Sequence, residues 1–174
     1  MTTGNEYVPR LSRALDRFIL GVGETAAWLN GILIVVIISQ VVLRYVFGKG
    51  LVILEESQWH LYAVGIMIGL SYCVVRDTHI RLDLLHQRFP RRRKEIVEIL
   101  GIVFLLMPMA IIVLMHSWPF VEQAFRLGER SDSPVGLPYR WIVKSFLLIG
   151  FGLLGIAGGS RAIRAAAFLI KNSR

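Results

Sequence analysis

Four long apolar stretches divide the chain, and each has the length that a helix needs to cross a lipid bilayer. Such a helix takes about 20 mostly apolar residues, and its backbone polar groups must pair within the helix because hydrocarbon offers no partner. The stretches are continuous rather than alternating, which excludes a transmembrane barrel. The pattern predicts an all-α integral membrane protein with spanning helices over residues 25–46, 56–76, 96–118 and 141–164.

Two shorter stretches beside these spans are amphipathic. Residues 9–22 place four large apolar side chains at helical spacing, with arginines on the other face: Leu11, Leu15, Phe18 and Val22. This pattern predicts an N-terminal interfacial helix lying on the membrane surface, and the alternative is a simple extension of the first span. Residues 79–94, which follow the second span, form a second predicted interfacial segment that Pro90 interrupts.

The composition agrees with a lipid solvent. Apolar residues make up 55% of the 174 residues and charged residues 18%, whereas soluble domains have about 45–50% and about 25%. A soluble domain of this size could not bury so much apolar surface. The single cysteine, Cys73, cannot form an internal disulfide and is expected to act as a small apolar residue.

The net charge of +8 follows from topology. Of the 20 Lys and Arg residues, 14 lie in the N-terminal tail, in the link between spans two and three, or from Arg161 onward. The other six lie near the two remaining links. By the positive-inside rule, both termini and the central link are predicted to be cytoplasmic. The basic charge therefore needs no nucleic-acid partner to explain it.

The middles of the four predicted spans carry no Asp, Glu, Lys or Arg. Ionisable side chains at mid-depth are costly in a membrane and mark ion pathways or proton relays. We therefore expect no catalytic residue, cofactor or metal site, and a chain that acts with a partner. The polar residues within the spans are expected to bond between helices: Asn30, Ser39, Gln40 and Ser71.

Two pairs of glycines have the spacing that lets helix backbones approach each other closely. Gly65 and Gly69 lie in the second span, and Gly155 and Gly159 lie in the fourth. This spacing favours either packing within the chain or docking on a partner, and the sequence leaves both open.

Two histidines raise one alternative function. His60 and His116 lie near the same predicted membrane surface, on the second and third spans. Two histidines at matched depth on facing helices can ligate haem, as in a membrane anchor of an oxidoreductase. The simpler interpretation places both at the headgroup level, like the neighbouring Trp59 and Trp118.

Charged residues flank the second span on both sides. Glu55 and Glu56 precede it, where carboxylates favour a helix N-terminus, and they are also candidates for a partner contact. On the other side, His79 and Asp83 are four residues apart and share a face if the segment is helical.

Several of these residues form an ordered set that resembles the small, DctQ-like membrane subunit of tripartite ATP-independent periplasmic (TRAP) transporters. The most specific element is His79-Ile80-x-x-Asp83-x-Leu85. The other matching elements are Arg44-Tyr-Val-Phe-Gly48, Glu55-Glu-Ser57, Gly69, Pro90, Ser131-Asp-Ser-Pro134, Pro138, Trp141 and Gly150. The resemblance covers roughly residues 42–155. The link Lys49–Leu54 departs from the family pattern, because it lacks the usual Pro and Trp.

The resemblance implies a scaffold subunit in the bacterial inner membrane. A large permease subunit would carry the substrate and sodium sites, and a periplasmic binding protein would deliver an organic acid by transient docking. It implies partner contacts at Arg44, Glu55, Glu56, Trp59, His79 and Asp83. The outer link 119–139 is expected to touch the binding protein through Glu122, Glu129 and Asp132.

Overall fold

The computed structural model describes residues 9–76, 90–133 and 135–171, and within them it is all-helical. Its helices are α1 (Arg10–Tyr45), α2 (Val52–Arg76), α4 (Arg91–Gly101), η1 (Ile102–Leu106), α5 (Met107–Arg126) and α6 (Arg140–Lys171). Helices α4, η1 and α5 run on without a break, so four helices are long and apolar enough to cross a membrane. The predicted membrane fold with four spanning helices is confirmed.

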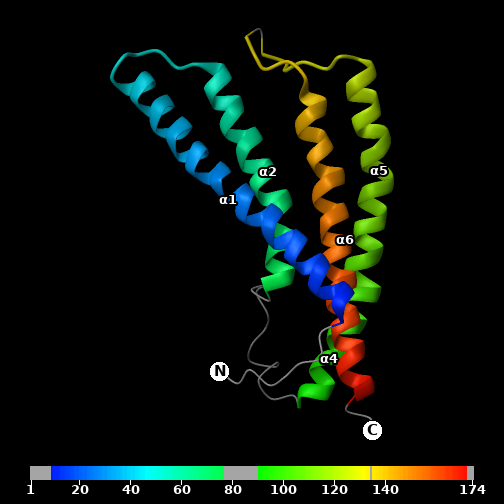
Figure 1. The fold of residues 1–174 in the computed structure, drawn as a ribbon. Coiled ribbons are helices and arrows are strands. Elements are labelled where there is room, and N and C mark those ends of the chain that lie inside the picture. Colours follow the sequence, from blue (N-terminus) through cyan, green and yellow to red (C-terminus); the bar gives the residue numbers. More distant parts are fainter. Residues whose placement is uncertain (1–8, 77–89, 134, 172–174) are drawn as a thin grey trace.

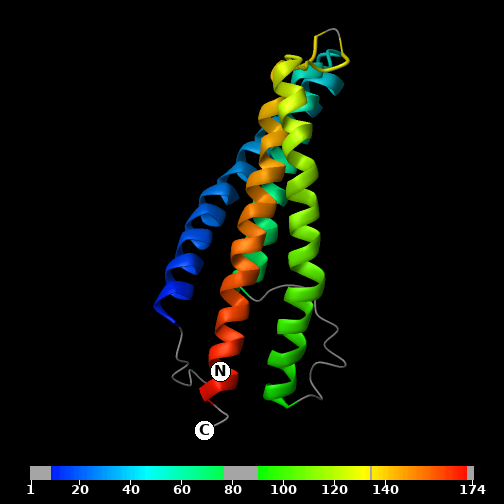
Figure 2. The ribbon, with the colours of Figure 1, turned by 90° about the vertical axis from the view of Figure 1, so that its right-hand side faces the viewer.

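Helix α6 lies at the centre of the bundle. It packs against α2 on one side and α5 on the other, and α1 packs mainly on α2. Figure 1 shows α1 starting beside the lower half of α6 and then running diagonally across α2. Figure 2 shows α5 and α6 side by side along most of their length. The four spans therefore form an open arrangement around α6.

The two ends of the bundle differ in what they hold. Residues 46–51, 127–133 and 135–139 lie at one end, which we call the loop end. The starts of α1 and α4 and the end of α6 lie together at the opposite end, which we call the terminal end (Figure 1). The core between them is apolar, with clusters around Ile19 and Ala157 and around Ala26 and Val64.

The N-terminal segment is not the separate interfacial helix that the sequence predicts. Helix α1 runs unbroken from Arg10 to Tyr45, so residues 9–22 extend the first span. The physical reason is that the polar side of this segment packs on α6: Ser12 and Asp16 are buried there, whereas Leu11 and Phe18 are exposed. Of the second predicted interfacial segment, residues 79–89 lie outside the described residues, and Arg91 begins α4.

Helix α5 continues past the predicted end of the third span. It includes Pro119 and ends at Arg126, where Gly128 takes a left-handed conformation with a φ of 56°. The Glu129 N–H donates to the Ala124 carbonyl at 3.0 Å and the Gly128 N–H to the Phe125 carbonyl at 3.1 Å. These two bonds form a Schellman motif, which satisfies the last carbonyls of the helix.

One turn of the third span is a π-helix. In η1 the N–H of Met107 bonds the carbonyl of Ile102, five residues earlier. The wider turn comes directly before Pro108, whose ring would clash with the Phe104 carbonyl in a regular α-helix.

Candidate partner-binding surfaces

The loop end is built around the carboxylate of Glu56. Its Oε1 accepts a hydrogen bond from the Ser131 hydroxyl, and its Oε2 accepts one from the Leu137 N–H at 2.6 Å. A Cβ at Gly136 would lie 2.3 Å from Ser131 Cβ and 2.8 Å from Glu56 Oε1, so only glycine fits there. Glu56 therefore holds Ser131 and Leu137 onto α2, and its predicted contact with a partner stays a prediction.

A second ion pair holds the same loop to α6. Glu129 pairs with Lys144 and lies 4.0 Å from Arg140. The Lys144 ammonium also lies 3.9 Å from the centre of the Phe120 ring, on the helix that leads into the loop. Glu129, predicted to touch the binding protein, thus has a structural partner in the chain.

The remaining acidic candidates near this loop differ in their surroundings. Glu122 pairs with Arg126 one turn further along α5, with 2.5 Å between Oε1 and the guanidinium. Asp132 is exposed, and the described part of the chain gives it no ion pair or hydrogen bond. Of the three predicted contacts, Asp132 is the one whose charge is left for another molecule.

An exposed ridge runs along α2 from the loop end. Glu55, Trp59, Tyr62 and Ile66 recur every three or four residues, which places them on one face of the helix. Trp59 is 68% exposed, and Tyr62 and Ile66 are also open. We call these four residues the α2 ridge. It brings together two predicted partner contacts, Glu55 and Trp59, with two side chains that sequence reasoning did not single out.

The other predicted partner contacts lie apart from this ridge or outside the described residues. Arg44 is exposed on the last turn of α1, and no described side chain pairs with it. His79 and Asp83 fall among the residues that the structure does not describe, so their predicted contact stays a prediction.

The terminal end holds a buried polar cluster that joins α1 to α6. The Ser12 and Ser160 hydroxyl oxygens lie 2.7 Å apart, and the Ser160 Oγ lies 2.6 Å from Asp16 Oδ1. Arg164 pairs with the other Asp16 oxygen at 3.0 Å. Because an ionised carboxylate only accepts, Ser160 donates to Asp16 and Ser12 donates to Ser160. These residues, more than 140 positions apart, fix the first turns of α1 on α6.

A second ion-pair cluster joins α4 to α6. The Arg161 guanidinium bonds Glu95 at 3.1 Å and both oxygens of Glu98, and its side chain is 15% exposed. Arg161 and Arg164, counted above among the basic residues that follow the fourth span, both pair with acidic side chains of other helices. The three-residue spacing of Glu95 and Glu98, which places them on one helix face, was the available signal.

Within the chain, the most crowded helical glycines are Gly23, Gly150 and Gly158, and docking of the two predicted glycine pairs on a partner stays a prediction. A Cβ at Gly150 would lie 2.7 Å from Met67 Cβ and 2.9 Å from the Met67 carbonyl oxygen. A Cβ at Gly23 would lie 2.4 Å from the Tyr72 ring, and one at Gly158 2.8 Å from Leu106. By contrast, Cβ atoms at the four predicted packing positions would meet ordinary contacts or open space: Gly65, Gly69, Gly155 and Gly159.

The two histidines of the haem alternative are not brought together. His60 is half-buried between α2 and α6, whereas His116 is exposed on α5 with its Nδ1 2.8 Å from the Ile112 carbonyl oxygen. Helix α6 lies between α2 and α5, so the two rings are on helices that do not face each other. Among the described residues, no group of three or more His, Cys, Asp or Glu side chains could hold a metal ion.

The comparison with known families finds a match over most of the chain. The family described as "Tripartite ATP-independent periplasmic transporters, DctQ component" matches residues 33–168, which is well over half of the chain. No curated protein and no solved structure gave a significant match. The matched region runs from the middle of α1 to the last turns of α6, and it includes the α2 ridge and the whole loop end.

Proposed function

The chain belongs to the DctQ family, the small permease component of TRAP transporters, and from this premise we propose that it scaffolds the large permease subunit of a sodium-dependent importer. The imported solute is an organic acid, such as a C4-dicarboxylate or sialic acid, delivered by a periplasmic binding protein. The chain itself performs no chemistry. It lies in the bacterial inner membrane with both termini in the cytoplasm.

The main support for this proposal is the position of the charged residues in the bundle. Each spanning helix has a long stretch free of Asp, Glu, Lys and Arg, and among the described residues the buried ion pairs lie at the two ends of the bundle. These stretches are residues 25–43, 57–75, 99–121 and 145–160. A carboxylate or sodium ion crossing such a bundle would find nothing to replace its hydration. This favours a supporting role beside another subunit that carries the solute.

The placement of basic residues supports the orientation. Arginines of α1, α4 and α6 gather at the terminal end, where Arg10, Arg13, Arg91 and Arg92 are exposed. The described residues of the loop end include fewer Lys and Arg side chains. The side richer in Lys and Arg faces the cytoplasm in most membrane proteins, so the loop end would face the periplasm.

The α2 ridge is our candidate for the contact with the large subunit. It combines a carboxylate, two exposed aromatic rings and an isoleucine on one helix face. Aromatic residues on a helix face are frequent anchors of protein interfaces, and a Glu beside them is poorly suited to lipid.

Co-purification with the large subunit tests the proposal. We expect the wild-type chain to be recovered with the large subunit, and Trp59→Ala to lower that recovery at least tenfold, as truncating an anchoring aromatic does. Trp118→Ala is the matched control, since Trp118 is 66% exposed on α5, and it should leave recovery unchanged. Liposomes containing this chain alone should take up no organic acid. Solute flux in those liposomes, or no association of the two subunits, would contradict the proposed function.

The exposed Asp132 gives a separate test of contact with the binding protein. We expect Asp132→Lys to raise several-fold the concentration of binding protein needed for half-maximal uptake, while co-purification of the membrane subunits stays intact. Glu129→Lys should instead place two cations together at Lys144 and disturb the loop itself. If the dependence of uptake on binding-protein concentration is the same for Asp132→Lys and wild type, Asp132 makes no such contact.

A further inference from the structure

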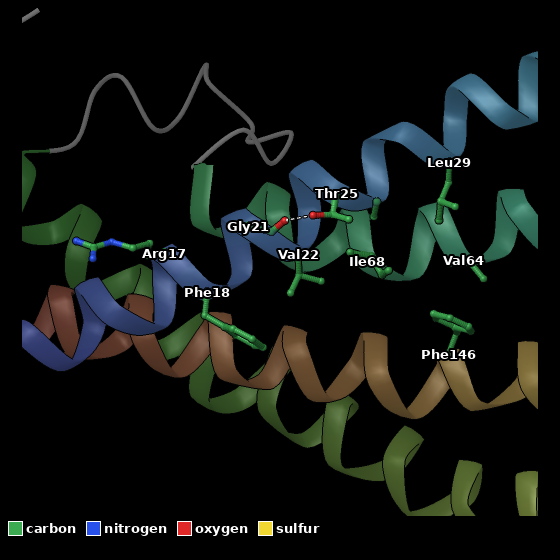
Figure 3. A pocket seen from close by; sticks show the side chains of 10 residues that line it. Arg17, Phe18, Gly21, Val22, Thr25, Leu29, Val64, Ile68 and Phe146 are labelled. Carbon is green, nitrogen blue, oxygen red and sulfur yellow. Dashed lines mark hydrogen bonds between the residues drawn. The ribbon is translucent and has the colours of Figure 1, made fainter.

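An apolar groove opens between α1 and α6, with α2 as its floor. Its volume is about 640 Å³, within the range of about 300–1,000 Å³ typical of ligand pockets. Figure 3 shows Phe18, Val22 and Leu29 of α1 on one side and Phe146 of α6 opposite, with Val64 and Ile68 of α2 between them. The groove lies beyond the polar contacts that hold the first turns of α1 to α6, where α1 diverges toward α2 (Figure 1).

The wall of this groove offers nothing polar to a ligand over most of its length. Thr25 is the one uncharged polar side chain among its lining residues, and its hydroxyl donates to the Gly21 carbonyl of the same helix at 2.8 Å. Gly21 and Ala26 contribute small surfaces, which widen the groove beside α1. An occupant must therefore be apolar along this stretch.

A positively charged side chain lies where the groove opens toward the terminal end of the bundle. Arg17 lines the groove there, and its side chain lies beyond Phe18, away from the apolar residues (Figure 3). Its sequence neighbour Asp16 is turned to α6 and committed to Arg164 and Ser160. Within the described part of the chain, Arg17 makes no ion pair or hydrogen bond. Its charge is left for an anion at the mouth of the groove.

The length of the groove matches one leaflet of a bilayer. From Arg17 to Leu29 the α1 axis rises about 18 Å, at about 1.5 Å per residue. The hydrocarbon of one leaflet is about 15 Å thick, half of the bilayer core. An acyl chain whose headgroup phosphate lies at Arg17 would thus run along the groove to the level of Leu29 and Phe146.

We propose that this groove is a specific binding site for an anionic phospholipid of the leaflet at the terminal end. Arg17 binds the headgroup phosphate, and the channel between α1, α2 and α6 takes one acyl chain. The lipid fills the space that the divergence of α1 leaves open beside the apolar cluster of Ala26, Val64 and Ile68. This site is independent of the α2 ridge and of any contact with a large subunit.

The test uses native mass spectrometry of the purified full chain with phosphatidylglycerol or phosphatidylcholine as probes. The wild type should retain one phosphatidylglycerol and prefer it to phosphatidylcholine. Arg17→Gln should reduce that preference about fivefold, the size expected for one cation near anionic lipid. Arg10→Gln, which removes an exposed cation from the same helix, should not change it.

A groove-filling variant tests the acyl-chain half of the site. Gly21 lines the groove, and a Cβ there meets nothing within 4 Å, so Gly21→Leu adds apolar bulk to the groove at a position with space for the new Cβ. It should weaken binding of both lipids on the order of tenfold, because fewer methylenes can be buried. Gly31→Leu is the matched control, since Gly31 is also uncrowded, is on α1, and lies outside the groove.

Three results would overturn the proposal. The first is equal lipid retention by Gly21→Leu and wild type. The second is an equal effect of Arg10→Gln and Arg17→Gln. The third is a Gly21→Leu chain that keeps its lipid but no longer co-purifies with the large subunit, which would assign the groove to a protein partner. Melting curves that match the wild type establish that the variants are folded.

Discussion

Replacing Arg164 with methionine is expected to lower the free energy of unfolding by about 3 kcal/mol or more. The substitution leaves Asp16 buried at the α1–α6 contact with only Ser160 as a partner. Breaking a buried ion pair by removing one member costs about 3–5 kcal/mol, because the other charge stays out of water without compensation. The measurement is unfolding of the purified chain by SDS titration, followed by circular dichroism.

Two companion variants make this result specific. Arg76 pairs with Glu24 at 3.1 Å across α1 and α2, but the two side chains are 48% and 62% exposed. Arg76→Met should therefore cost less than about 1 kcal/mol. The double variant Asp16→Leu with Arg164→Met should recover most of the loss, since it removes both charges. Equal losses of unfolding free energy for Arg164→Met and Arg76→Met would show that burial of the Asp16–Arg164 pair does not increase its contribution to stability.

The second large effect is expected at the crossing of α2 and α6. Gly150→Ala adds one Cβ that would lie 2.7 Å from Met67 Cβ and 2.9 Å from the Met67 carbonyl oxygen. Backbone atoms cannot turn aside as a flexible side chain can, so the two helices must separate. We expect a loss of about 1–3 kcal/mol, as for overpacked cores, measured by the same SDS titration.

The control for this variant lies five residues along the same helix. A Cβ at Gly155 would meet nothing within 4 Å, and alanine is the better helix former by up to about 1 kcal/mol. Gly155→Ala should therefore leave stability unchanged or raise it. The two substitutions are chemically identical, but only Gly150→Ala is predicted to destabilise the chain. A destabilising Gly155→Ala with a neutral Gly150→Ala would support the pattern inferred from sequence over the contacts seen here.

The spanning helices could be predicted from sequence because the bilayer sets their length and polarity almost by itself. The partners of charged side chains could not. The sequence around Arg161 and Arg164 does not indicate any acidic partner, because Glu98 and Asp16 are 63 and 148 residues away. The partners of Glu56 could not be predicted either. Its position suggests a carboxylate at the start of a helix, but it binds Ser131 and Leu137 of a loop far away in the sequence.

Glycine spacing shows why local patterns were insufficient for packing. The pairs in α2 and α6 have the separation typical of close helix contacts, yet the crowded positions are Gly23, Gly150 and Gly158. A glycine pattern identifies helix positions that lack a side chain, but it does not identify which face of the helix packs against another helix. Likewise, the N-terminal segment has an amphipathic pattern suited to a membrane surface, but its polar face has a partner on α6.

The π-turn in the third span sets the rotational phase between the two halves of that helix. The π-turn contains one residue more than an α-turn would, so the side chains of α4 are rotated about the helix axis relative to those of α5. If residues 91–126 formed a regular α-helix, Glu95 and Glu98 would swing by about 100° around the axis relative to α5. They would then point away from Arg161, and α4 would lose the ion pairs that hold it to α6.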